Sequence, residues 1–457
     1  MQILIQNGTI VRSTGRRKAD VLVKDGKIVK IAPNIDAKAD RVINAEGCYL
    51  FAGFIDTHTH FELNLGSTTT ADDFESGTKA AVVGGTTTVL DFATQDRGMT
   101  MHDALNEWHR KADGKSSCNY GFHMAVSEWN DARKAEVDDM FRAGVSSFKM
   151  YMVYDAMKVT DGEIYDAQKF IRDRGGVIGV HCENYDLLQA RIREERAKGN
   201  LGPTGHPASR PQAVEAEGVA RLMRIAELSG SPAWVVHLST ADGLEEVRRA
   251  RKRGVEVYAE TCPQYFTLDV SQYAEPDGAK YVMSPPLREA KDRAAILDGM
   301  KKKDIDFIGT DHCSFTMAQK AIGKDDFSKI PNGGAGIQNR AELVYTYAVE
   351  TGAITLEQMA LLMSERAAKL FGMFPKKGVL RVGSDADIAI FDPNDPHTIS
   401  WKTNLHAIDN SPYEGKKVLG RTRDVILNGE LVVENGKLVK PYCGRFVFRN
   451  PCERYRR

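Results

Sequence analysis

Short apolar runs alternate with amphipathic stretches throughout the middle of the chain. Eight of these runs have the length and residue types of buried strands. They are Leu50–Thr57, Thr86–Ala93, Asn119–Val126, Val145–Met150, Val177–His181, Ala233–His237, Val255–Glu260 and Asp304–Thr310. Helical periodicity lies between several of them, as in AVEAEGVARLMRIAELS and GLEEVRRARKRG. This order of elements predicts an α/β fold, a TIM-like (β/α)8 barrel that carries insertions.

The rival arrangement is a doubly wound sheet, which needs a glycine-rich phosphate-binding turn after an early strand. The sequence contains no such turn. Long loops that follow barrel strands usually shape a pocket. We expect three of them, at Asn184–Gln212, Pro263–Arg288 and Cys313–Arg340.

The two ends of the chain share a different pattern. NGTIV and DGKIVK near the start, and NGELV and NGKLVK near the end, place Asn-Gly or Asp-Gly between apolar β-formers. Such dipeptides are typical of type I′ hairpins. We therefore expect one composite β-sandwich domain from residues 1–50 and 375–440, attached to a barrel of residues 51–374. The basic tail 441–457 is either a mobile terminus or an arm that docks on another subunit.

Composition narrows the class of protein. The 457 residues contain 62 Lys plus Arg and 62 Asp plus Glu, so net charge offers no reason to expect nucleic acid or an anionic membrane as a partner. No apolar run approaches the roughly 20 residues of a membrane span, and the N-terminus lacks the pattern of a signal peptide. Seven scattered cysteines without a CxxC pair predict reduced thiols and a cytoplasmic location.

Metal-binding side chains stand where the expected strands stop. His58 and His60 are two residues apart in DTHTH, so extended backbone points both imidazoles the same way. One histidine at a strand end is usually a packing residue, but several at converging strand ends are hard to attribute to packing. The predicted metal-binding set is His58, His60, Lys149, His181, His237 and Asp311.

Lys149 is the unexpected member, since it lies in the apolar stretch GVSSFKMYMVY. Burial and nearby positive charge both favour its neutral amine. A neutral amine can add carbon dioxide, and the resulting carbamate can bridge two metal ions as a glutamate would. A lysine that snorkels to the barrel mouth or forms a Schiff base is the alternative. Either would leave the histidines without a bridging anion.

Motifs distributed over most of the chain now identify a family. GFIDTHTHF, SSFKMYMVY, VHCEN, VVHLST, AETCPQYF, MSPPLR, GTDHCSF and NGGAGI resemble the cyclic amidohydrolases of the amidohydrolase superfamily. The pattern is most similar to the hydantoinases and dihydropyrimidinases, in particular the bacterial D-hydantoinases. The resemblance covers essentially the whole chain, including the split β-domain, and implies an enzyme that acts on small cyclic amides.

The resemblance also implies a site with two Zn²⁺ ions per subunit, with Mn²⁺ or Co²⁺ as alternatives. His58, His60 and Asp311 would hold one ion and His181 and His237 the other, with carboxylated Lys149 and a hydroxide between them. The hydroxide would attack a ring carbonyl, and Asp311 would move its proton to the leaving nitrogen. By the same resemblance, Tyr154 would polarise the carbonyl and the backbones of Ser284 and Asn332 would hold the ring's amide edge. Members of this family are usually homotetramers.

Several substrates fit this family. Phe61 replaces the arginine that dihydroorotases usually carry after HxH, and Lys149 argues against mononuclear deaminases. We expect ring opening of 5-substituted hydantoins to N-carbamoyl amino acids, D-selective by resemblance. Dihydropyrimidinase and allantoinase activities remain alternatives, and a non-catalytic scaffold relative conflicts with the complete set of ligands. An apolar pocket for the 5-substituent could form from Leu63, Leu65, Phe92, Met152, Met157 and Val159, although these residues could equally be ordinary loop packing.

Overall fold

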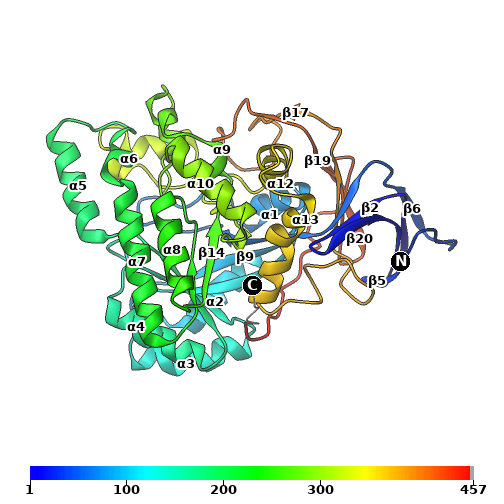
Figure 1. Ribbon diagram of the computed structural model, residues 1–457, viewed down its shortest axis with the longest axis horizontal. Coiled ribbons are helices and arrows are strands. Elements are labelled where there is room, and N and C mark those ends of the chain that lie inside the picture. The colour runs from blue at the N-terminus through cyan, green and yellow to red at the C-terminus, as the bar shows by residue number, and fades with distance from the viewer. Residues whose placement is uncertain (453–457) are drawn as a thin grey trace.

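The computed structural model describes residues 1–452 (Figure 1). A parallel sheet of eight strands forms a ring at its centre. Strands that are neighbours in the chain are also neighbours in the sheet, and every pair is parallel. The eight are β8 (Phe54–Thr59), β9 (Thr86–Gln95), β10 (Asn119–Val126), β11 (Ser147–Tyr151), β12 (Val177–His181), β13 (Ala233–Val235), β14 (Val257–Thr261) and β15 (Phe307–Ile308). The predicted barrel is therefore confirmed.

The ring closes between β8 and the chain that follows β15. Thr59 forms a parallel bridge with His312, and the backbone N–H of His60 donates to the carbonyl of His312 at 2.8 Å. At the opposite end of the barrel the buried guanidinium of Arg340 donates to the carbonyls of Ile55 in β8 and Ile308 in β15, at 2.8 and 2.9 Å. Backbone and side-chain hydrogen bonds thus join the first and last strands.

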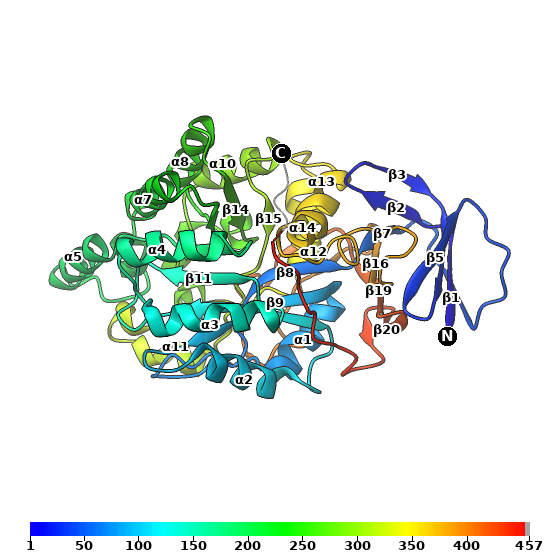
Figure 2. The same ribbon diagram turned by 90° about the horizontal axis from the view of Figure 1, so that it is seen from below.

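Helices cover the outside of the barrel (Figure 2). The longer ones are α1 (Phe74–Val83), α2 (Met101–Ala112), α3 (Asp131–Arg142), α4 (Asp161–Arg172), α5 (Tyr185–Ala197), α7 (Gln212–Ser229), α8 (Ala241–Lys252) and α10 (Ala290–Lys301). Short helices are α6 (Gly205–Ser209), α9 (Gln264–Thr267), α11 (Met317–Lys320), α12 (Arg340–Val344), α13 (Leu356–Ala360) and α14 (Arg366–Leu370). Among residues 1–452, no helix combines the length and apolar character that crossing a membrane requires.

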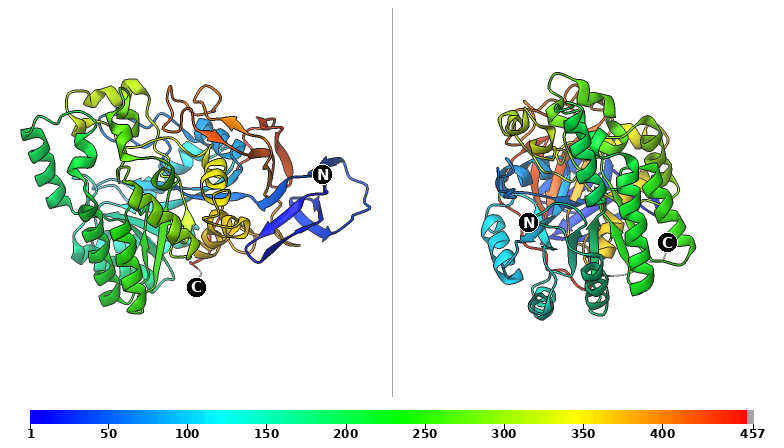
Figure 3. Two further views of the ribbon diagram at one scale, coloured as in Figure 1. Left: turned by 45° about the horizontal axis from the view of Figure 1, so that its top comes forward. Right: turned by 90° about the vertical axis from the view of Figure 1, so that its left-hand side faces the viewer.

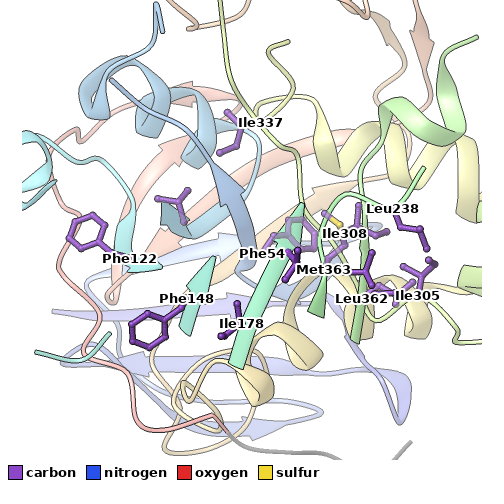
Figure 4. Close-up of a cluster of buried hydrophobic side chains, with 14 of the residues drawn as sticks. Phe54, Phe122, Phe148, Ile178, Leu238, Ile305, Ile308, Ile337, Leu362 and Met363 are labelled. Atoms are coloured by element: carbon purple, nitrogen blue, oxygen red, sulfur yellow. The ribbon is translucent and has the colours of Figure 1, made fainter. Parts of the chain in front are cut away.

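Apolar side chains from strands and helices fill the space between the ring and its covering. Figure 4 shows part of this core, with Phe122 from β10, Phe148 from β11 and Ile178 from β12. Ile308 from β15 belongs to the same cluster as Met363, which follows α13. The continuous apolar runs that predicted the strands are explained by this burial, since a strand in a closed parallel barrel is covered on both faces.

Two sequence expectations about elements were wrong. The run Leu50–Thr57 is not one strand, because β7 (Tyr49–Ala52) belongs to another sheet and β8 begins at Phe54. Gly53 separates them at a close approach, where an added Cβ would lie 2.0 Å from Oγ1 of Thr87. The segment expected as a loop at Asn184–Gln212 contains α5, whose first turn is capped by the side chain of Asn184.

Both chain ends build a separate two-sheet β-domain, which lies at one end of the elongated molecule (Figure 3). One sheet has the order β5 (Lys27–Ala32), β4 (Asp20–Lys24), β1 (Gln2–Gln6) and β6 (Arg41–Asn44). The other has the order β21 (Lys437–Leu438), β20 (Glu430–Glu434), β19 (Arg421–Leu427), β16 (Ile388–Asp392), β7, β2 (Thr9–Arg12) and β3 (Gly15–Lys18). Apolar residues of both sheets share one core, which confirms a composite β-sandwich.

The Asn-Gly and Asp-Gly signals had mixed outcomes. Asp25-Gly26, Asn428-Gly429 and Asn435-Gly436 connect antiparallel neighbours, and all six residues have positive φ. Asn7-Gly8 instead leads from β1 to β2, which lie in different sheets, so a hairpin there was wrong. A short two-strand ladder of β17 (His397–Thr398) and β18 (Lys417–Val418) completes the strands of the described part of the chain.

The described part of the C-terminal tail lies on its own barrel. The N–H of Val447 donates to the carbonyl of Tyr120 at 2.7 Å, and the buried guanidinium of Arg449 donates to the hydroxyl of Ser147 at 2.7 Å. Residues 441–452 therefore pack along the amino-terminal ends of β10 and β11. The remainder of the predicted arm, 453–457, lies outside the described residues.

Replacing Arg340 by Met is expected to destabilise the barrel. The substitution leaves the carbonyls of Ile55 and Ile308 unpaired and removes the guanidinium that lies 3.8 Å from the buried carboxylate of Asp56. Loss of one partner of a buried ion pair costs about 3–5 kcal/mol, which urea unfolding would measure. Arg224→Met, on the exposed face of α7, is the matched control and should leave the midpoint of urea unfolding unchanged. Equal midpoints for the two variants would contradict a role for Arg340 in closing the barrel.

Candidate metal centre

The predicted ligands meet at the carboxyl ends of the barrel strands. Parallel strands of a closed barrel bring these ends to one mouth, which is why residues far apart in sequence become neighbours. In chain order the positions are His58 and His60 at the end of β8, Lys149 in β11, His181 at the end of β12, His237 two residues after β13 and Asp311 three residues after β15.

Backbone conformation at this mouth is unusual. Tyr154, His237 and Asp311 have φ values of +73°, +38° and +53°, in the left-handed region that residues with a Cβ rarely adopt. Such conformations cost about 1–3 kcal/mol each and persist where surrounding contacts enforce them, often at active sites. Three strained residues of the predicted site set therefore support a functional role for the mouth.

His58, His60 and Asp311 form a compact group. Oδ1 of Asp311 lies 3.1 Å from Nε2 of His58 and 3.3 Å from Nε2 of His60. One ligand atom from each of the three lies within 4.8 Å of the others, an arrangement suited to one metal ion. Burial lowers the pKa of His58 well below its usual value, so that imidazole is neutral and has a lone pair for a metal.

His181 and His237 form a second pair beside the first. Their ring centroids are 4.5 Å apart, and the centroid of His237 is 5.3 Å from that of His58. Burial lowers the pKa of both imidazoles. Nδ1 of His237 is buried without a hydrogen-bond partner among residues 1–452, as is Nδ1 of His60. A buried nitrogen without a hydrogen-bond partner costs free energy. These histidines therefore fit a site that a bound metal ion completes.

Lys149 lies beside His58. Its Nζ is 2.8 Å from Nε2 of His58 and 4.2 Å from the centroid of the Phe92 ring, and the side chain is buried. It forms no ion pair with a carboxylate in the described part of the chain. Burial lowers its pKa to about 8, although the carboxylates of Asp311 and Glu260 act in the opposite direction. The apolar sequence around Lys149 therefore does create a site that disfavours an ammonium.

Three residues that sequence reasoning missed orient the histidines. Glu260, in β14, places its carboxylate 2.5 Å from Nδ1 of His58, which leaves Nε2 facing the site. Glu183 contacts Nε2 of His181 at 2.6 Å and accepts a hydrogen bond from Arg210 at 2.6 Å. Partners of this kind fix the ring orientation and tautomer of metal-binding histidines. Glu183, two residues after His181 in VHCEN, could have been found from the two-residue strand period.

The pKa values of Glu260 and Glu183 are shifted in opposite directions. Burial raises the pKa of Glu260 well above its usual value, and hydrogen bonds only partly offset this. Burial acts in the same direction on Glu183, but the charge of Arg210 and the hydrogen bond from His181 outweigh it and hold the pKa of Glu183 well below its usual range. Glu183 is therefore the firm anion of the pair.

The predicted substrate-binding residues border the same mouth. The ring centroid of Tyr154 lies 5.2 Å from that of His181, and burial raises the pKa of its phenol, which keeps the hydrogen-bond donor in place. The side chain of Ser284 is buried and interacts with the phenol of Tyr154. Oδ1 of Asn332 is buried without a hydrogen-bond partner within residues 1–452. The segments carrying them are joined, because the N–H of Gly333 donates to the carbonyl of Val282 at 2.9 Å.

The six apolar residues expected around a ring substituent come from β9 and from two loops. Phe92 is fully buried beneath the histidines, with its ring centroid 4.6 Å from that of His58 and 5.1 Å from that of His60. The other five lie in two mouth loops, between β8 and α1 and between β11 and α4. Those loop residues are Leu63, Leu65, Met152, Met157 and Val159.

Known proteins share both the sequence and the architecture. The model of the amidohydrolase family matches residues 49–432. A D-hydantoinase of Geobacillus stearothermophilus is 43% identical over 455 residues, which cover 98% of this chain and 97% of that protein. A dihydropyrimidinase of Dictyostelium discoideum is 40% identical, with 98% of this chain and 91% of that protein covered. A crystal structure of a D-hydantoinase superimposes with a TM-score of 0.97 at 42% identity, covering 98% of this chain and 99% of that one.

Matches of this extent span both the barrel and the terminal β-domain. The chain is therefore a cyclic amidohydrolase and belongs to the hydantoinase and dihydropyrimidinase group of the amidohydrolase family.

Proposed function

We propose that the protein opens the ring of 5-substituted hydantoins to N-carbamoyl amino acids, with preference for the D enantiomer, at a binuclear zinc site. The observation that carries the proposal is the position of Lys149, a buried amine 2.8 Å from Nε2 of His58 that forms no ion pair with a carboxylate in the described part of the chain. The hydantoin ring and its hand are inferred from the names of the relatives, which are D-hydantoinases. Homotetrameric assembly and a cytoplasmic location are part of the same proposal.

The donor set fits two divalent ions. His58, His60 and Asp311 would hold one ion, and His181 and His237 the other. The neutral amine of Lys149 would form an N–C bond with carbon dioxide and release one N–H proton, which gives an anionic carbamate. Imidazole and carboxylate oxygen donors suit zinc, and also manganese and cobalt. When bound, such ions lower the pKa of water toward neutrality and so supply a nucleophile at physiological pH.

Asp311 would act as the proton carrier of the reaction. Burial opposes its ionised form, but the imidazoles of His60 and His237 outweigh burial and hold its pKa below the usual range. The ionised carboxylate accepts a proton from the attacking water and delivers it to the ring nitrogen as the C–N bond breaks. The contacts of Asp311 with His58 and His60, at 3.1 and 3.3 Å, support this role.

Tyr154, Ser284 and Asn332 would hold the substrate ring. The protonated phenol of Tyr154 donates a hydrogen bond to the carbonyl oxygen, where negative charge develops. Backbone groups of Ser284 and Asn332 pair with the amide edge of the ring, which all candidate ring classes share. Leu63, Leu65, Met152, Met157 and Val159 would face the 5-substituent and favour apolar groups.

Dihydropyrimidinase activity is the second candidate. The observation that favours it is the dihydropyrimidinase of Dictyostelium discoideum, which matches 98% of this chain at 40% identity. The two rings present the same amide edge, so discrimination would depend on the loops at the mouth.

A substrate panel tests the choice directly. Zinc-loaded enzyme, with about two ions per chain, is incubated with D- and L-5-substituted hydantoins, dihydrouracil, allantoin and dihydroorotate. We expect the D-hydantoins to give the largest kcat/KM, measured as N-carbamoyl product by chromatography. A larger kcat/KM for dihydrouracil would assign the protein as a dihydropyrimidinase instead.

Lys149→Ala is expected to lower both activity and metal content. Loss of the bridging anion removes several kcal/mol of stabilisation, which corresponds to a fall in kcat of about a thousandfold or more. Zinc measured by mass spectrometry should fall from about two ions per chain to about one. Lys169→Ala, an exposed lysine on α4, is the control and should retain both properties. Full zinc content in Lys149→Ala would rule out a bridging carbamate.

Asp311→Asn tests the proton carrier. The amide keeps the shape of the side chain but cannot accept the proton, so kcat should fall by about 10²- to 10⁴-fold. Zinc content is measured on the same preparation, and kcat is compared per bound metal pair. A variant that retains both ions and turns over at the wild-type rate would exclude Asp311 as the proton carrier.

A further inference from the structure

Lys320 is a buried lysine that the proposed reaction does not use. It is the last residue of α11 and is 1% exposed. Its Nζ donates three hydrogen bonds, all to backbone carbonyls, at 2.8 Å to Val282, 2.7 Å to Pro331 and 2.7 Å to Gly333. An ammonium has three N–H donors and no acceptor, so these contacts use its full capacity.

The three carbonyls belong to the two segments that would hold the substrate. Val282 precedes Ser284 by two residues, and Pro331 and Gly333 flank Asn332 on both sides. The carbonyl of Val282 also accepts the N–H of Gly333, at 2.9 Å. Lys320 therefore links two loops whose residues are nearly 50 positions apart in the chain, at the point where both reach the mouth.

Packing alone does not explain a lysine at this position. No carboxylate lies within ion-pair distance of Nζ in the described part of the chain, and the ring of Phe315 is 5.2 Å away at its centroid. Burial disfavours the ammonium of Lys320 and so lowers its pKa, whereas the three carbonyls that accept from Nζ favour the charged form. Burying an amine costs free energy that a methionine of similar size would avoid. What the amine adds, and a methionine could not, is the three hydrogen bonds to the backbone carbonyls.

We propose that Lys320 is a positioning residue, which holds the Ser284 and Asn332 segments at the separation that the amide edge of the substrate requires. The inference rests on the proposed function, in which backbone groups of these two residues bind the ring. Lys320 acts through the backbone and touches neither the substrate nor the candidate metal ligands. Its removal should therefore weaken binding of the ring more than it slows the chemical step.

The test compares Lys320→Met with Lys324→Met. The first keeps a side chain of similar length without its donors, and the second changes an exposed lysine four residues later. With the cyclic amide that the wild type opens fastest, KM of Lys320→Met should rise by about tenfold or more. Loosened loops would weaken the hydrogen bonds from the backbones of Ser284 and Asn332 to the ring, and each such bond contributes up to about tenfold in affinity. We expect kcat to stay within about threefold and zinc content to be unchanged. Lys324→Met should match the wild type.

Amide hydrogen exchange separates positioning from general stability. In Lys320→Met, peptides covering residues 279–287 and 329–336 should exchange faster, while peptides from β12 and β14 keep their wild-type rates. Faster exchange throughout the barrel, or a wild-type KM in the variant, would overturn the proposal. A fall in kcat with unchanged KM would overturn it as well.

A second variant guards against misfolding. Lys320→Gln retains a polar donor in the cavity, and its KM should lie between those of the wild type and Lys320→Met. If both variants are insoluble, amide exchange in the wild type tests the proposal. The two loop segments should then be as protected as β12, and unprotected segments would refute the link through Lys320. Failure of the proposed function gives a different result, in which the wild type itself opens no cyclic amide.

Discussion

The contact between the end of β8 and the chain after β15 is the constraint on which the site depends. His60 and His312 share a backbone hydrogen bond across this seam, and Asp311 is thereby held against His58 and His60. One half of the candidate metal centre thus exists because the barrel closes. The left-handed backbone at Asp311 follows from the same geometry, since the chain must turn at the seam to bring a carboxylate back over β8.

Buried hydrogen-bond partners then determine which nitrogen of each histidine offers its lone pair to the site. Glu260 engages one nitrogen of His58 and Glu183 engages one nitrogen of His181, so the other nitrogen of each ring is directed to the site. A buried carboxylate needs compensation, and Glu183 receives it from Arg210. Contacts within the protein therefore orient the histidines. In known metal centres, too, hydrogen-bond partners on the far side of each ligand fix its orientation.

Topology explains which of these features could be predicted. The ligands lie at or near the carboxyl ends of strands, so an eight-strand barrel was enough to predict that they meet. Glu260 also ends an expected strand, Val255–Glu260, but a lone glutamate there carries no sign that it pairs with His58, 202 residues away. The division at Gly53 was missed for a different reason: residues on both sides are apolar, and only a close approach to Thr87 requires the glycine. Lys320 resembles any surface lysine until its three carbonyl partners are known.

Each of the three long segments after β12, β14 and β15 contains a buried cation, and contacts of these cations link the segments in series. Lys320, in the last segment, binds the carbonyl of Val282 in the middle one. Arg288, at the end of the middle segment, donates to the carbonyl of Arg210 in the first, at 2.6 Å. Arg210 in turn binds Glu183, which contacts His181. Lys320 and Arg288 thus each bind the preceding segment, Arg210 binds Glu183 within its own segment, and the series ends on a candidate metal ligand. Under the proposed function these contacts would steady the walls that hold the ring edge, and substrate preference would vary in the loops after β8 and β11.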